Sequence, residues 1–285
     1  FIEGAGKVIL NGTHMVDIQQ INGETFYDFE NRNTARHIDI AGNTTVTNNY
    51  YAAAGGPACE TFVTASTFDI QNILYLDQGT FGLSASGPDV TVGTFDQGGT
   101  LYVTDGTFTA YDLIEDYLYG DYVLNDGLIE LNQGPTDYFD LAANIEIHNG
   151  NFNLVGGNDV SYWSVGGSPL TFEMTGGTLT FEDVGIRLTS NDYSYDISGG
   201  AIRTYGDFTS NPGVSVFDPS GGSVHMLGNT NSAISQGTGS FFHDLVIEKY
   251  GATGVNCSSD LLIKNELRIK EGEFNTHGYQ VDVIP

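Results

Sequence analysis

A short motif recurs along this chain at a nearly constant spacing. It consists of a glycine, a small or polar residue, an apolar residue, a spacer and a second apolar residue. The motif begins at Gly79, Gly106, Gly127, Gly150, Gly177, Gly200, Gly222 and Gly272. The successive intervals are 27, 21, 23, 27, 23, 22 and 50, the last equal to two of 25. The period is therefore roughly 23 residues, and a fixed period in this range is typical of solenoids.

The pattern within each repeat indicates the kind of solenoid. Apolar and polar residues alternate with a period of two, which predicts strands rather than helices, and a leucine-rich consensus is absent. We therefore predict an all-β fold, a right-handed parallel β-helix (β-solenoid) of about 12 coils of roughly 23 residues, as a single domain over residues 1–285. The apolar residues should stack inside as ladders, and the glycines should supply the positive φ of tight corners.

The chain also contains a second, longer sequence repeat. Residues 1–29 align without a gap on residues 217–245, at an offset of 216. Residues 68–81 align on residues 261–274, at an offset of 193. The difference between the two offsets equals the length of one coil.

The first copy should therefore carry one extra coil, around residues 37–60. We assign the duplicated modules to residues 1–81 and 217–283. Neither module shows a polar capping helix, and uncapped strand edges favour the addition of further strands. This pattern predicts either a part of a longer array or copies that self-associate end to end as a filament.

The charge of the chain narrows the choice of partners. Nine Lys and Arg residues face 36 Asp and Glu residues, for a net charge of −27, and no Lys or Arg lies between Arg36 and Arg187. Phosphate contacts need clustered cations, so a nucleic-acid partner is excluded and an anionic membrane surface is disfavoured. No apolar run is long enough for membrane insertion. Divalent cations, neutral glycans and other surface proteins remain as partners.

The segment Gly221–Val283 resembles a module of secreted and cell-surface β-helix repeat proteins of the Bacteroidota. The matching positions are Phe242, Leu245, Ile247, Leu262, Leu267, Ile269, Gly272, Phe274, Gly278, Tyr279 and Val281. The N-terminal copy, residues 1–81, matches less closely. The resemblance implies an extracellular or cell-surface location and no catalytic residues. We expect a non-catalytic structural or adhesive solenoid.

An enzyme acting on polysaccharides is the alternative, because right-handed β-helices often carry such activities. A lyase needs a Lys or Arg base beside carboxylate-bound Ca²⁺, and the stretch between Arg36 and Arg187 contains no such base. A hydrolase needs paired carboxylates, and no adjacent Asp-Asp or His-containing signature is present. We therefore predict that the chain is not an enzyme and keep a carbohydrate-binding or polysaccharide-degrading protein as the second hypothesis.

Aromatic residues gather in the middle of the chain, in a stretch that is also acidic. The candidates for a glycan or protein contact are Tyr111, Tyr117, Tyr119, Tyr122, Tyr162 and Trp163. Alternation predicts that some of these rings face outward, where aromatic rings beside carboxylates hold sugars or another protein. Packing inside the ladders is the other interpretation.

Calcium is the cofactor that the acidic turns favour. The candidate ligands are Glu115, Asp116, Asp121 and Asp126. Carboxylates that converge with backbone carbonyls provide the oxygen ligands that Ca²⁺ needs. Ordinary solvated turns are the alternative interpretation.

The two cysteines, Cys59 and Cys257, should not pair with each other. They lie about eight coils apart, on the order of 40 Å, whereas a disulfide needs Cα atoms within about 7 Å. We predict buried free thiols, with a bridge between stacked copies as the alternative.

Overall fold

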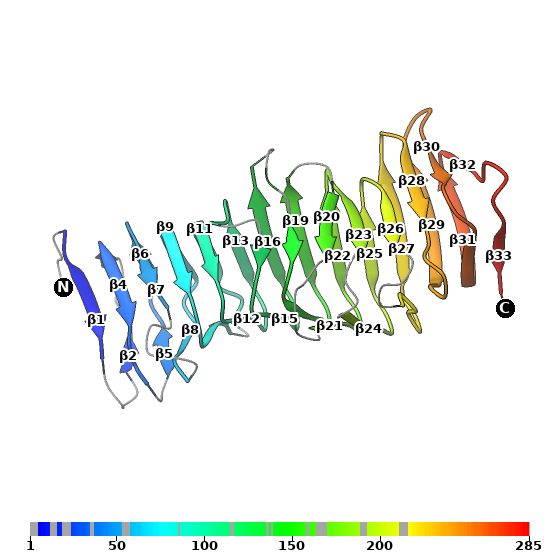
Figure 1. The fold of residues 1–285 in the computed structure, drawn as a ribbon. Coiled ribbons are helices and arrows are strands. Elements are labelled where there is room, and N and C mark those ends of the chain that lie inside the picture. The colour runs from blue at the N-terminus through cyan, green and yellow to red at the C-terminus, as the bar shows by residue number, and fades with distance from the viewer. Residues whose placement is uncertain are drawn as a thin grey trace. The chain divides into compact units, whose positions relative to one another are not determined.

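The structure is a computed structural model. It describes residues 5–11, 16–18, 24–34, 37–52, 58–84, 86–114, 117–134, 137, 139–157, 160–163, 170–188, 193–210 and 216–284, without the side chains at 16–18, 37 and 160–163. The described residues form strands and turns with no helix, so none of them belongs to a helix that could cross a bilayer. The fold is a parallel β-solenoid (Figure 1). It consists of two compact units, Phe1–Asn132 and Gln133–Pro285, which are described one at a time.

The first unit contains two stacks of parallel strands. The first stack runs in the order β1 (Lys7–Leu10), β4 (Asp28–Asn31), β7 (Tyr50–Tyr51), β9 (Thr67–Leu76), β11 (Asp89–Gln97), β13 (Thr107–Ala110) and β16 (Leu128–Gln133). The short strands β3 (Glu24–Phe26) and β6 (Thr44–Val46) extend it. The second stack runs β2 (Val16–Ile18), β5 (His37–Ile40), β8 (Glu60–Val63), β10 (Thr80–Leu83), β12 (Thr100–Val103) and β15 (Asp121–Leu124). A further strand, β14 (Tyr117–Leu118), precedes β15.

The second unit contains three stacks. One runs β19 (Asn151–Gly156), β22 (Thr178–Glu182), β25 (Ala201–Thr204), β27 (Ser223–Gly228), β29 (Phe242–Lys249), β31 (Leu261–Glu271) and β33 (Val281–Val283). Another consists of β18 (Asn144–Ile147), β21 (Leu170–Met174) and β24 (Tyr193–Ile197). The third runs β17 (Asp140–Leu141), β20 (Val160–Trp163), β23 (Gly185–Leu188), β26 (Phe208–Ser210), β28 (Ser232–Ser235), β30 (Gly254–Cys257) and β32 (Glu273–Asn275).

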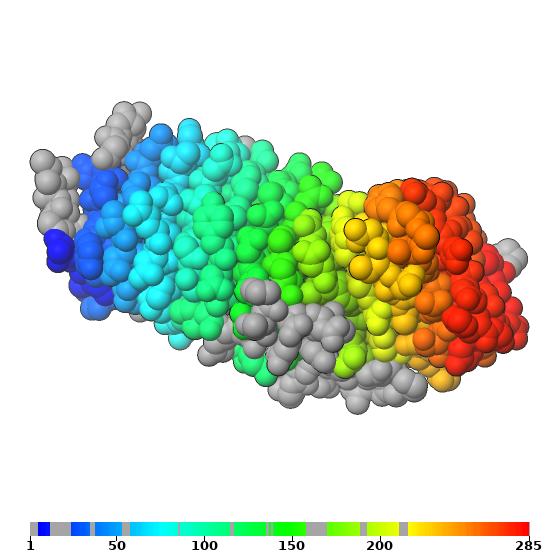
Figure 2. Space-filling view, turned by 90° about the horizontal axis from the view of Figure 1, so that it is seen from above, coloured from blue at the N-terminus to red at the C-terminus, as the bar shows by residue number. Residues whose placement is uncertain are grey.

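Consecutive strands of a stack are one turn apart in the sequence. Asp89 pairs with Thr107 across a short turn, and Asn151 pairs with Thr178 across a long one. In the space-filling view, successive turns of each unit form successive bands in chain order (Figure 2). The repeat period seen in the sequence is therefore the average length of a turn. Right-handed winding, the number of 12 coils and the single domain remain predictions.

The glycines of the motif form the corners of the turns. All eight have positive φ, between 69° and 91°. A side chain has no space at several of them: a Cβ atom on Gly106 would lie 2.2 Å from the carbonyl oxygen of Pro88, in the preceding turn. The corners thus need glycine both for the backbone conformation and for the close approach of neighbouring turns. This prediction is confirmed.

The interior consists of stacked apolar side chains, as the alternation predicts. In the first unit, Phe68, Phe81, Phe95 and Phe108 are buried, and the rings of Phe95 and Phe108 pack edge to face with centroids 5.1 Å apart. Burying each large apolar side chain contributes about 1.5–3 kcal/mol. The ladders therefore provide the main stabilisation of the turns.

The sequence duplication extends to the pairing of the strands. In the first unit Lys7 pairs with Asp28, and in the second unit Ser223 pairs with Asp244. Both members of the second pair follow from the first by adding 216, so the two modules have the same strand register.

The extra turn of the first module can be identified directly. In the second unit Leu245 pairs with Leu267 on the next turn. The corresponding residues of the first unit, Phe29 and Leu74, are separated by Tyr50, which pairs with both. The rings of Phe29 and Tyr50 stack with centroids 5.1 Å apart. One whole turn is therefore inserted in the first module, as the two offsets predict.

Candidate functional site

Three of the predicted contact residues are exposed on the first unit. Tyr111 is 64% exposed, Tyr117 46% and Tyr119 41%. The rings of Tyr117 and Tyr119 stack, with centroids 5.6 Å apart and an angle of 18° between their planes. Leu118, between them, is buried and holds the strand β14 against the interior. We call the stacked pair Tyr117 and Tyr119 the tyrosine surface.

Tyr122 does not belong to this surface, and the prediction that it contacts a partner is wrong. Its side chain is buried, and burial raises the pKa of its hydroxyl well above the usual value. Tyr122 lies three residues after the exposed Tyr119, so the alternation of side chains places it on the opposite, inward face, like Leu118 and Leu124. Tyr162 and Trp163 lie on β20, and their side chains are outside the described residues.

The predicted calcium ligands are only partly placed by the structure. Glu115 and Asp116 lie outside the described residues. The carboxylate of Asp126 accepts a hydrogen bond from the backbone N–H of Gly127 at 2.8 Å, which shapes the corner before β16. The carboxylate of Asp121 accepts one from the hydroxyl of Thr100, on the neighbouring strand, at 3.4 Å. Both contacts are structural, and calcium binding stays a prediction.

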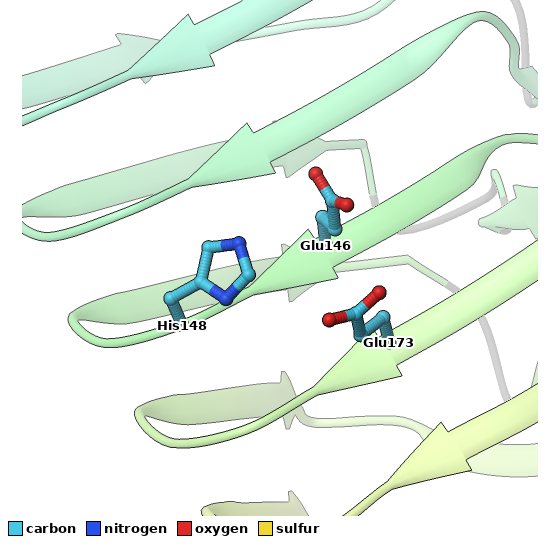
Figure 3. A group of neighbouring side chains, drawn as sticks. All are labelled: Glu146, His148 and Glu173. Carbon is cyan, nitrogen blue, oxygen red and sulfur yellow. The ribbon is translucent and has the colours of Figure 1, made fainter.

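A group of potential metal ligands that the sequence analysis missed lies on the second unit. Glu146 is on β18, His148 follows this strand directly, and Glu173 is on β21. One ligand atom from each of the three side chains lies within 4.8 Å of the others. Figure 3 shows the imidazole ring and the two carboxyl groups on the same face of the strands. We call these three residues the Glu-His-Glu cluster.

The pairing of β18 with β21 creates the cluster. Glu146 pairs with Glu173 on the next turn. The sequence contains a signal for this contact, since the interval between these two glutamates equals the interval between Gly150 and Gly177. The next strand continues the row of acids, because Glu173 pairs in turn with Asp196 on β24.

The stack of β27, β29, β31 and β33 leaves apolar ladders uncovered. Met226 and Ile247 are buried, whereas the next member of that ladder, Ile269, is 51% exposed. A second ladder runs from the buried Ile263 to Val283, which is 45% exposed. Tyr250, Tyr279 and Ile284 are also exposed in this region. We call β31, β33 and their exposed apolar side chains the open edge.

Both cysteines are buried thiols in their units, as predicted. Burial raises the pKa of the Cys257 thiol to about 11, so this thiol stays protonated and unreactive near neutral pH. The sulfur of Cys59 contacts the backbone oxygen of Asn31 at 3.6 Å. Neither position is suited to a bridge between copies.

Comparison with known proteins found no matching family model, curated protein or solved structure.

Proposed function

We propose that this chain is a non-catalytic, extracellular structural or adhesive solenoid, a cell-surface or filament-forming subunit that stacks end to end with further copies. The open edge carries the proposal. Its apolar ladders continue the interior of the second unit to Ile269 and Val283, which a further turn would bury. Burial of two half-exposed side chains of this size, with pairing of the β33 backbone, favours the addition of strands.

The repeated module supports a second copy of the chain as the occupant. The strands β1 and β4 pair in the same register as β27 and β29, so the first unit offers the same kind of turn that already stacks within the second. Among the described residues, β1 pairs on one side only, with β4. Its Ile9 is an exposed apolar side chain.

The distribution of charge also supports this junction. Lys264, Arg268 and Lys270 all lie on β31, in a chain whose net charge is −27. Lys7 lies on β1. These cations lower the repulsion that two copies with so many carboxylates would otherwise meet when they approach.

Sedimentation velocity and negative-stain electron microscopy at rising protein concentration test this proposal, with and without Ca²⁺. We expect oligomers whose size grows with concentration. Ile269→Lys and Val283→Lys should each suppress the assembly, while Ile114→Lys, at an exposed apolar position of the first unit, should not. Dispersed single particles under all conditions, or assembly unaffected by both edge variants, would contradict end-to-end stacking.

The extracellular location rests on the resemblance of the segment Gly221–Val283 to secreted and cell-surface β-helix proteins. Antibody labelling of intact cells that produce the protein tests it. Labelling without permeabilisation is expected, and labelling only after permeabilisation would contradict this part of the proposal.

Glycan binding is the second candidate function, and the tyrosine surface favours it. Two stacked, half-exposed rings, Tyr117 and Tyr119, provide the flat apolar faces on which sugar rings pack. This function is compatible with adhesion, since an adhesive surface protein needs a ligand.

A further inference from the structure

We propose that Glu146, His148 and Glu173 form a binding site for a divalent transition-metal ion, with Zn²⁺ the ion that the ligand set matches best. The proposal is independent of end-to-end stacking, because the cluster lies on β18 and β21 and the open edge lies on β31 and β33.

The backbone holds the three ligands on one face of a sheet. Glu146 and His148 are two residues apart, so they project to the same side of the strand, while Ile147 between them is buried. Glu173 projects from the neighbouring strand, and the flanking Phe172 and Met174 are buried. The inward side chains therefore fix the positions from which the ligands extend outward.

The distances within the cluster suit a metal ion after small side-chain rotations. The ligand atoms lie within 4.8 Å of one another. Zinc bonds to nitrogen and oxygen are about 2.0–2.2 Å long, so the ligand atoms around one ion lie roughly 3–3.5 Å apart. None of the three side chains is buried, which leaves them free to close this gap.

The chemistry of the ligands selects the ion. An imidazole with two carboxylates is a typical mixed nitrogen and oxygen set for Zn²⁺, with water filling the remaining position. Ca²⁺ needs six to eight oxygen ligands, and imidazole is not one of them. The cluster thus differs from the calcium site predicted for the acidic turns of the first unit.

Two further contacts favour an ion at this position. The Nδ1 atom of His148 lies 3.2 Å from the hydroxyl oxygen of Thr175, which orients the ring and leaves Nε2 for a metal. Glu146 and Glu173 are direct cross-strand partners, and like charges in this arrangement repel each other. A bound cation would convert this repulsion into attraction.

Isothermal titration with ZnCl₂, using the whole chain, tests the site. We expect one tight site per chain, and at least a tenfold weaker affinity in His148→Ala and in Glu173→Gln. His277→Ala and Glu182→Gln, at non-buried positions of the same unit, are the matched controls and should bind like the wild type. Thr175→Val keeps all three ligands and should weaken binding by a smaller factor than His148→Ala.

Two other measurements keep the test decisive. Co²⁺ in place of Zn²⁺ should give visible absorption bands with the wild type, and these bands should be absent with His148→Ala. Zn²⁺ should also raise the melting temperature of the wild type but not that of His148→Ala. Circular dichroism of the metal-free variants controls for folding, with Glu146→Gln as the conservative substitute if His148→Ala unfolds. A variant that combines Glu146→Gln, His148→Ala and Glu173→Gln removes all three ligands. Zn²⁺ binding by this variant equal to that of the wild type would overturn the proposal.

Discussion

The ammonium group of Lys249 lies 2.6 Å from the hydroxyl oxygen of Ser232, inside the second unit. The lysine side chain is fully buried. Its Nζ atom also donates to the carbonyl oxygen of Tyr205, at 3.2 Å, and to that of Leu227. Three acceptors thus match the three hydrogens of the ammonium group. Strand β29 is thereby tied to the turns that contain β25, β27 and β28.

Replacing Lys249 should strongly destabilise the fold. Lys249→Met keeps an apolar chain of similar length but leaves the carbonyl oxygens of Tyr205 and Leu227 and the hydroxyl of Ser232 without this donor. We expect the free energy of unfolding to fall by about 2–4 kcal/mol, measured by urea denaturation. Lys264→Met is the control: its partly exposed ion pair with Asp218, at 2.6 Å, should contribute less than about 1 kcal/mol. Equal losses in the two variants would contradict the structural role of Lys249.

The same lysine should make stability depend on pH. Burial lowers its pKa from the usual 10.5 to about 8. Between these two values the unfolded chain holds a proton that the folded chain has released, so this group makes the free energy of unfolding rise with pH. We therefore expect the stability advantage of the wild type over Lys249→Met to increase from pH 7 to pH 10. Denaturant titrations of both proteins at pH 7, 8.5 and 10 measure it, and a constant difference would refute it.

The glycine corners allow backbone strain to be separated from crowding. A Cβ atom on Gly127, where φ is 86°, would lie 2.2 Å from the carbonyl oxygen of Gly106. Gly251, with φ of 76°, has nothing within 4 Å of such an atom. Gly251→Ala should cost about 1–2 kcal/mol, the penalty of the left-handed conformation alone. Gly127→Ala should cost roughly 2 kcal/mol more, because the backbone of the adjacent turn must move. Similar unfolding free energies for the two variants would argue against tight stacking of the corners.

Glycan binding should depend on the stacked rings. If the second candidate function is correct, a glycan array with the wild type will give signals for neutral sugars, and Tyr117→Ala and Tyr119→Ala will each reduce them at least tenfold. Tyr279→Ala removes an equally exposed ring of the second unit and should leave them unchanged. A silent array, or equal effects of all three variants, would remove this function.

The periodic part of the fold is predictable because it depends on local rules. The corners need a residue that adopts positive φ and has no side chain, which is glycine. The alternation of apolar and polar residues follows from the pleat of a strand. The offsets of 216 and 193 also identify the inserted turn at Tyr50 before any contact is known. These features are fixed by residue type and spacing alone.

The candidate sites are less predictable because they depend on which face of each strand points inward and on the length of each turn. Tyr122 is buried while Tyr117 and Tyr119 are exposed, because it lies an odd number of positions after either ring, and the composition of the segment does not show which face of the strand points inward. The contact of Glu146 with Glu173 requires the register of β18 and β21, and the turns differ in length from one another. A turn of average length would place a different residue beside Glu146.

The inserted turn has a consequence for how such a chain can change in evolution. Phe29, Tyr50 and Leu74 stack in one ladder where the other module needs only Leu245 and Leu267. A tandem duplication or deletion of one whole turn therefore preserves the register on both sides and disturbs no contact further away. Length can vary in steps of about 4.8 Å per turn, so the reach of the molecule can change without any rearrangement of the turns that remain.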